Sequence, residues 1–312
     1  MHFSRANSLV MQTMPFILLR LAVYSVFAIG ILFYFSIVSV FSIILGLVHS
    51  SLSPIVWIVG LLASFPLTRL VREYLLYMVK AAHVAVLAEL ATKGTLPDGM
   101  SQITWGRKQV QQRFGATSIL FIMDRLVNSV VHAINSTMSR IGGFFDIIPG
   151  VGGLVQLANK VLYFSLTYVD ESILARNFLN DKETIWQSAE NGLVLYAQAW
   201  KSILKTAFFL GLIAMIVFPV LFIIFMVPAL TLASIWPSKQ PLFFIAAFLF
   251  AYVLKAAFLD PWTLANMILT YLEATKGLSP DREWTQKLEM ISSKFKKIRE
   301  NNTAGTTAPT VA

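Results

Sequence analysis

The chain has 312 residues, of which 56% are apolar and 13% are charged, with a net charge of +9 and a mean hydropathy of +0.68. Soluble domains carry about 25% charged residues, so this composition excludes an ordinary soluble protein and predicts an all-α, polytopic membrane protein. The absence of cysteine excludes disulfides and thiolate metal sites, and the cations flank apolar runs instead of covering a polar domain suited to nucleic acid.

The chain opens with two apolar runs. No Asp, Glu, Lys or Arg occurs within residues 21–68, a length sufficient for two spans of about 20 residues each. We place spans at 16–47 and 54–76, separated by a short turn that ends at Pro54. Arg20 stands near the start of the first span, where its side chain can extend to the lipid headgroups.

The segment after the second span is cationic, whereas the turn at 49–53 carries no Lys or Arg. The cations are Arg69, Arg72, Lys80, Lys93, Arg107, Lys108 and Arg113. The positive-inside rule therefore places the amino terminus in the cytoplasm, and the cationic tail predicts the same for the carboxyl terminus. Amphipathic patterns predict further helices on the inner membrane surface, in contact with anionic lipids, at about 74–92, 185–204, 261–276 and 283–299.

A hairpin at 116–170 combines apolar helical patterns with polar stripes. Polar residues recur every three or four positions along 116–138 and 153–169, so each set shares one helix face. If both patterns span the membrane, the stripes face each other as a polar path. A re-entrant pair and a surface pair fit the same pattern. The stripe residues are Asp124, Asn128, His132 and Asn135, then Gln156, Lys160, Tyr163 and Asp170.

Two more apolar runs complete the set of membrane helices. We place spans at 206–235 and 242–259, which gives four membrane helices, or six with the polar hairpin. Residues 1–300 are expected to form a single integral membrane domain. The small, polar residues at 301–312 are expected to be disordered.

Two matches within the chain indicate an internal repeat. Residues 91–98 share Ala-Thr-Lys-Gly and Pro-Asp with residues 274–281 at the same spacing, and 170–179 match 260–269 more weakly. One explanation is chance similarity between apolar compositions. The other is a duplicated unit of a hairpin followed by an interfacial helix, with both copies in the same orientation.

No catalytic or metal-binding motif is present. The sequence lacks HExxH, GxSxG and Walker A patterns, and the glycines at 149–153 suit a tight turn between helices. The adjacent acids Asp170 and Glu171 fit either charges at a helix end or a proton or cation site. We expect no enzymatic activity, no cofactor and no bound metal.

The stretch 160–273 resembles the carboxyl-terminal part of the choline transporter-like family, although this chain is shorter and lacks that family's cysteine-rich extracellular loop. The resemblance implies transport of choline or a related small organic cation, and it transfers no binding residue. The matching pieces are Ser188 and Ala189, the apolar runs within 206–259, and then Asp260, Leu264, Leu272 and Glu273.

Two functional hypotheses follow. The polar stripes suggest a transporter or permease for a small, organic cation-like solute. The amphipathic helices suggest a non-enzymatic membrane scaffold or assembly subunit, with a homo-oligomer or a membrane-protein complex as its context. The lack of cysteine and of a cleavable signal is compatible with a bacterial inner (cytoplasmic) membrane, with both termini cytoplasmic.

Overall fold

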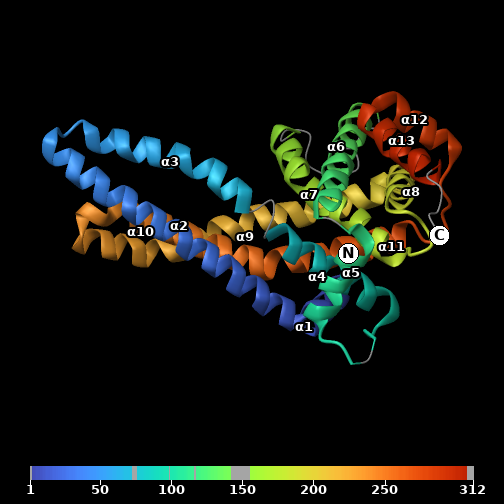
Figure 1. Cartoon of the computed structure of the whole chain (residues 1–312), viewed down its shortest axis with the longest axis horizontal. Coiled ribbons are helices and arrows are strands. Elements are labelled where there is room, and N and C mark those ends of the chain that lie inside the picture. Colours follow the sequence, from blue (N-terminus) through green and yellow to red (C-terminus); the bar gives the residue numbers. More distant parts are fainter. Residues whose placement is uncertain (1, 72–75, 98, 116, 142–154, 308–312) are drawn as a thin grey trace. The chain divides into compact units, whose positions relative to one another are not determined.

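The computed structural model describes residues 2–71, 76–97, 99–115, 117–141 and 155–307, and no strand occurs in these ranges (Figure 1). The chain forms two compact units. Unit 1 contains residues 1–15, 81–213 and 262–312, and unit 2 contains residues 16–80 and 214–261. A single integral membrane domain at residues 1–300 stays a prediction.

Most helices coincide with predicted segments, although the helices Phe3–Gln12 and Gln102–Phe114 were not predicted and the patterns at 185–204 and 283–299 are each divided between two helices. The bounds are α1 (Phe3–Gln12), α2 (Met14–Val48), α3 (Leu52–Val71), α4 (Tyr77–Lys93), α5 (Gln102–Phe114), α6 (Thr117–Ile141), α7 (Val155–Leu179), α8 (Ile185–Gln198), α9 (Trp200–Ile235), the 3-10 turn η4 (Pro237–Lys239), α10 (Gln240–Leu254), the π-helical turn η5 (Lys255–Leu259), α11 (Asp260–Ala274), α12 (Arg282–Ile291) and α13 (Ser293–Thr307).

Three helical segments among the described residues are long and apolar enough to cross a membrane: Met14–Val48, Trp200–Ile235 and Pro237–Ala274. Residues Leu52–Pro66 of α3 form a shorter apolar helix, and α5 with part of α6 meets the same criteria only as a bent pair. The prediction of an all-helical protein with membrane-compatible helices is thereby confirmed, whereas a count of four to six spans stays a prediction.

Helix α9 changes its environment along its length. In unit 1 many of its apolar side chains are buried, with Ile203 and Leu204 fully inaccessible. In unit 2 the same helix exposes large apolar side chains, including 63% of Ile223 and 64% of Val227. The part in unit 2, residues 214–235, is about 33 Å long, close to the hydrocarbon thickness of about 30 Å. These exposed side chains therefore suit contact with lipid.

Within unit 2, α2 and α3 form a tightly packed hairpin. The Tyr34 hydroxyl donates a hydrogen bond of 2.8 Å to the carbonyl oxygen of Gly60. A Cβ atom on Gly60 would lie 2.7 Å from Val38 Cγ1, so glycine is required for this approach. Small residues serve the same purpose in membrane helix pairs, because dispersion contacts replace the hydrophobic effect there.

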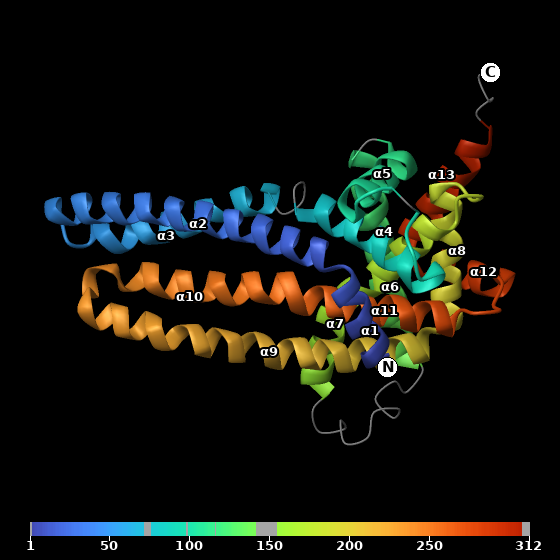
Figure 2. The same ribbon diagram turned by 90° about the horizontal axis from the view of Figure 1, so that it is seen from below.

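Helices α9 and α10 form the second hairpin of unit 2, and α10 also packs against α2 (Figure 2). Phe248 of α10 meets both Phe218 and Phe222 of α9 in edge-to-face contacts. An apolar cluster joins the first half of α2 to the end of α10 and to η5, and it also includes the residue before α4. Its members are Tyr24, Ala28, Leu76, Leu249, Val253 and Ala256. Because the first half of α2 lies beside the end of α10, these two helices are antiparallel.

Arg20 does not extend to the surface as its position in the sequence suggested. Its side chain is only 2% exposed, and its guanidinium carbon lies 5.9 Å from the centre of the Tyr24 ring. Tyr24 is one helical turn further along α2, so its ring offers a nearby face for the cation.

Helices α4 and α11 are core helices of unit 1, which corrects the prediction of interfacial helices at 74–92 and 261–276. Every residue from Ala81 to Ala91 is buried, and so is every residue from Thr263 to Tyr271. The small alanine side chains of α4 let neighbouring elements pack around it. The residues that flank α1 contact α4 and α11. His83 Nε2 of α4 lies 3.0 Å from the Thr13 hydroxyl, and the His2 amide donates a hydrogen bond to Asn266 Oδ1 of α11.

The two copies of the sequence repeat share their local structure. Helices α4 and α11 each end before a glycine with positive φ, Gly94 at 78° and Gly277 at 77°. An amphipathic helix follows each turn, α5 in one copy and α12 in the other. A π-helical turn precedes α11, and Leu76, directly before α4, is also π-helical. This shared order supports the duplicated unit.

Helix α13 continues to Thr307, into the segment predicted to be disordered. Asn302 explains part of this order, because its amide donates to Glu190 at 3.0 Å and its Oδ1 accepts from Thr184. Both partners belong to the α8 region. The residues 308–312 lie outside the described ranges.

Candidate functional site

The predicted polar stripes lie on α6 and α7, which pack against each other in unit 1. Asn128 Nδ2 donates a hydrogen bond of 2.6 Å to Asp170 Oδ2, and the Glu171 amide donates to Asp170 Oδ1 at 2.8 Å. Asp170 is 4% exposed and Glu171 is 2% exposed. The structure thus joins the two stripes at this point, inside the protein.

A second pair joins the stripes further along the hairpin. The ring of His132 lies 4.9 Å from the ring of Tyr163, at an angle of 44°. Tyr163 is 64% exposed, and Lys160, one turn before it on α7, is also exposed. This end of the stripe therefore faces the surroundings of the protein.

Asn135 departs from the stripe and contacts α8 instead. Its Oδ1 accepts a hydrogen bond of 2.7 Å from the Tyr196 hydroxyl, while its Nδ2 donates to the carbonyl oxygen of Val131. Burial raises the pKa of Tyr196 far above its ordinary value, although the bond to Asn135 opposes this shift. Tyr196 therefore stays protonated and acts as the donor.

The two remaining stripe residues add little to this geometry. Asp124 is half-buried on α6. Gln156 belongs to α7, but its side chain lies outside the described residues. The stripe is therefore not a continuous channel lining among the described residues, because two of its members, Asp170 and Asn135, are buried in separate hydrogen-bonded pairs.

Sequence patterns did not reveal the densest polar network, at the end of α7. Arg176 Nη1 lies 2.7 Å from Glu183 Oε2, and its Nη2 lies 3.1 Å from Glu183 Oε1. The same Nη1 atom donates to the carbonyl oxygen and the hydroxyl of Ser188 on α8. The break in the helical pattern around Glu183 predicts a turn there. The sequence gives no sign, however, that Glu183 pairs with Arg176, seven residues earlier.

The electrostatics of this network favour a charged carboxylate. Burial alone would raise the pKa of Glu183, but its hydrogen bonds to Arg176 and the charge of that arginine outweigh burial, with help from Asn191. The pKa of Glu183 therefore lies below its ordinary value. Arg113 of α5 completes the junction by donating to the carbonyl oxygens of Asn177 and Asn180, the acceptors left free at the end of α7.

No family model, curated protein or solved structure matches the chain. The resemblance to the choline transporter-like family therefore stays an expectation from the sequence. In the described part of the chain, no group of three His, Asp or Glu residues is arranged to hold a metal ion.

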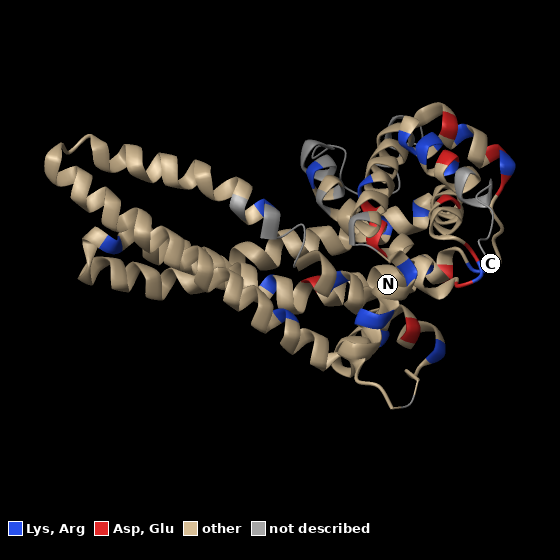
Figure 3. Ribbon diagram, in the orientation of Figure 1, with Lys and Arg blue, Asp and Glu red and all other residues tan. Residues whose placement is uncertain are grey.

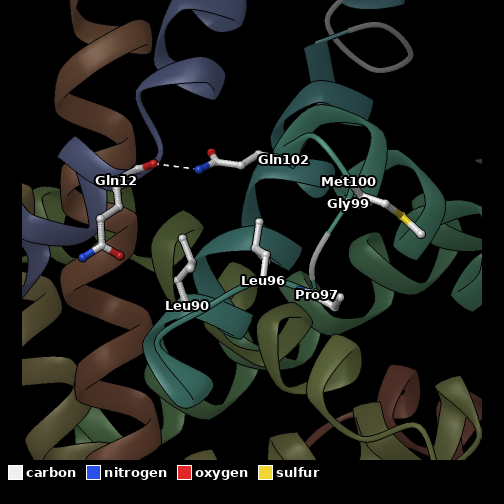
Figure 4. A pocket seen from close by; sticks show the side chains of 7 residues that line it. All are labelled: Gln12, Leu90, Leu96, Pro97, Gly99, Met100 and Gln102. Carbon is white, nitrogen blue, oxygen red and sulfur yellow. Dashed lines mark hydrogen bonds between the residues drawn. The ribbon is translucent and has the colours of Figure 1, made fainter.

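A separate hollow of about 420 Å³ lies in unit 1 beside the turn between α4 and α5 (Figure 4). It is open to the surroundings and its described lining carries no charged side chain. Gln102 Nε2 donates a hydrogen bond of 2.7 Å to the carbonyl oxygen of Gln12 and so joins α5 to the end of α1. The lining residues are Gln12, Leu90, Leu96, Pro97, Gly99, Met100 and Gln102.

Proposed function

We propose that this protein is a non-enzymatic membrane scaffold whose two apolar hairpins hold a helical domain at the cytoplasmic face. The hairpins α2–α3 and α9–α10 would cross the bilayer, and unit 1, including α6 and α7, would stay on one side. This is the scaffold alternative raised by the sequence. In it, the polar hairpin at 116–170 is a pair of helices outside the membrane core and does not span the bilayer.

The observation that carries this proposal is that polar stripe residues form hydrogen bonds with other side chains inside the protein. A solute path needs polar groups that are free to exchange partners, whereas Asp170 and Asn135 are 4% and 5% exposed and are bound to Asn128 and Tyr196. Helix α6 also packs against α13, whose exposed residues include Lys294, Lys296 and Lys297. Such a charged neighbour suits water better than hydrocarbon.

The distribution of charge supports the same arrangement (Figure 3). Most of the coloured charged residues lie on helices of unit 1, and the apolar helices of unit 2 are nearly free of them. Within unit 2, Arg20, Arg69 and Lys255 lie near the helix ends that lead into unit 1, and Lys239 lies at the tip of the α9–α10 hairpin. This asymmetry fits the positive-inside rule, with anionic lipids as partners of the cations.

Single-cysteine labelling tests this topology, because the natural chain has no cysteine. We expect Ser51→Cys and Lys239→Cys, at the two hairpin tips, to react in intact cells with a maleimide that cannot cross membranes. Lys160→Cys on α7 and Lys297→Cys on α13 should react only after the membrane is permeabilised. Ser51, Lys160 and Lys297 are exposed, and Lys239 is half-buried between two exposed residues, so protection by folding does not explain a missing signal.

Denatured protein provides the control, since all four variants must label equally once unfolded. Reaction of Lys160→Cys from outside would place α7 across the membrane and overturn the scaffold proposal. Reaction of Lys297→Cys from outside would overturn the cytoplasmic orientation of unit 1.

Transport of a small organic cation is a second candidate, and one feature of unit 2 favours it. Lys255 Nζ lies 2.7 Å from Asp260 Oδ1 within the candidate span Pro237–Ala274. The π-helical turn allows this pairing, because the Asp260 amide bonds to the Lys255 carbonyl oxygen five residues earlier. Pro261 explains the turn: its ring would clash with the carbonyl of Ala257 in a regular helix. Ionisable pairs and π-turns inside spans often mark functional sites.

Uptake of radiolabelled choline into proteoliposomes tests this candidate. The scaffold proposal predicts no uptake above protein-free liposomes. If transport is the function, Asp260→Asn should lower the rate at least about tenfold, because a hydrogen bond to a charged group contributes about 1.5–3 kcal/mol. Asp281→Asn, in an exposed helix cap outside the spans, should leave the rate unchanged. Uptake that is lost in the first variant and kept in the second would replace the scaffold proposal.

A further inference from the structure

An exposed surface of unit 1 combines apolar and cationic side chains. Met11 at the end of α1 is 66% exposed, Met100 is 41% exposed and Ile103 on α5 is 39% exposed. Arg107 and Lys108 on α5 are exposed as well. We call these five residues the α1–α5 surface. Large apolar side chains grouped on a surface usually mark a contact with another apolar body.

The geometry of α5 holds this surface in place. Ser101 caps the helix by accepting a hydrogen bond from the Thr104 amide, and Gln102 ties the first turn to Gln12. Ile103 and Arg107 are four residues apart, so they project from the same side of α5. The buried residues Trp105, Val110 and Phe114 fix α5 to unit 1.

The two cations of the surface are available to a partner. Among the described residues neither Arg107 nor Lys108 forms an ion pair, whereas Arg5 donates to Ala91 and Lys93 pairs with Glu89. The hollow beside Met100 is lined by Leu96 and Pro97 together with Gln12 and Gln102 (Figure 4). The surface thus offers apolar contacts next to free positive charge.

The chain itself brings this surface to the membrane. Helix α2 begins at Met14, three residues after Met11. Its 35 residues have a length of about 52 Å, which exceeds the hydrocarbon core of about 30 Å and the whole bilayer of about 40–45 Å. Even with a tilt of about 30°, the first turn of α2 lies at the level of the headgroups. Met11 must lie within about 10 Å of the same level, because a chain of three residues reaches no further.

We propose that the α1–α5 surface binds the anionic lipid surface of the bilayer, with Met11, Met100 and Ile103 among the upper acyl chains and Arg107 and Lys108 at lipid phosphates. This inference rests on the proposed crossing of the membrane by α2. Charge favours a lipid surface over a protein partner. A protein partner could use the apolar residues alone, whereas the two cations beside them match an anionic headgroup above acyl chains.

Fluorescence quenching in vesicles tests the proposal on the full chain. Met100→Cys is labelled with an environment-sensitive dye and the protein is reconstituted in vesicles with brominated phosphatidylglycerol or brominated phosphatidylcholine. We expect quenching by both lipids, stronger by phosphatidylglycerol. Arg107→Gln with Lys108→Gln should reduce this preference, by up to about fivefold for each cation. Lys182→Cys, exposed in the turn between α7 and α8, serves as the matched control and should not be quenched.

The outcomes separate this inference from the scaffold proposal. Quenching at Met100→Cys that is no greater than at Lys182→Cys would overturn the lipid site, and so would equal quenching by the two lipids or a preference that survives loss of both cations. In that case correct labelling of Ser51→Cys and Lys239→Cys would still support the two hairpins. If those two positions label from the cytoplasmic side, the membrane topology itself fails.

Discussion

Replacing Arg176 with Leu is expected to lower the free energy of unfolding by about 3 kcal/mol, the lower end of the range for a broken buried ion pair. The side chains of Arg176 and Glu183 are only 13% and 22% exposed, so the substitution leaves a poorly solvated carboxylate. It also removes both hydrogen bonds to Ser188, which fix the end of α7 to α8. Urea unfolding in mild detergent, followed by tryptophan fluorescence, measures the loss.

A double substitution separates the charge effect from simple packing. Arg176→Leu combined with Glu183→Leu removes both charges, so it should recover a large part of the lost stability. Arg176→Lys keeps the charge but not the paired geometry, and we expect an intermediate value. A loss below about 1 kcal/mol, typical of surface pairs, would mean that this junction does not stabilise unit 1.

The same pair predicts a dependence on acid. Because the pKa of Glu183 is lowered in the folded protein, its stabilising contribution is complete above the ordinary value of 4.5 and is lost as the pH falls through the lower, folded value. The variant that lacks both charges should therefore lose less stability than the natural protein on acidification below that pH.

Gly211→Ala should produce the second large effect. A Cβ atom at this position on α9 would lie 1.9 Å from Ser165 Oγ and 3.2 Å from the carbonyl oxygen of Val161 on α7. Ser165 is held in place by its own bond to that carbonyl, 2.6 Å long. Overpacking of this kind costs about 1–3 kcal/mol, and more where backbone must shift. The thermal midpoint in detergent should fall accordingly.

Gly30→Ala is the matched control, because a Cβ there meets no atom within 4 Å. Alanine is the better helix former by about 1 kcal/mol, so this variant should be as stable as the natural protein or slightly more stable. Adding Ser165→Ala to Gly211→Ala removes the closest contact and should restore part of the midpoint. Equal midpoints for the two glycine variants would contradict the close approach of α7 and α9.

Hydropathy and helical periodicity predicted the helices well, since long uncharged runs have few alternatives to a helix. The spacing of Asn128 and His132 on one pattern, and of Tyr163 and Asp170 on the other, was also sufficient to suggest that the two stripes meet. The structure brings Asn128 to Asp170 and His132 to Tyr163. It could not be foreseen that Asn135 turns to Tyr196, because that contact joins α6 to a helix outside the hairpin.

The environment of α4 was harder to predict for a physical reason. A run of alanine and valine has similar polarity on all sides, so the pattern of Ala81–Ala91 looks alike at a membrane surface and in a protein core. The deciding contacts come from distant parts of the chain: His83 meets Thr13, and Ala91 meets Arg5. A single sequence contains no signal for such pairings. The junction of Arg176, Glu183 and Ser188 escaped prediction for the same reason.

The arrangement of apolar helices in two hairpins also bears on how the protein is made. With both hairpins across the bilayer, as proposed, each pair of helices returns the growing chain to the side from which it came. Only the short tips around Ser51 and Pro237 then have to be moved through the bilayer, and Lys239 is the one Lys or Arg that they carry. Insertion of each helix pair as a unit therefore leaves the long charged segments beside the ribosome, where they can fold in water.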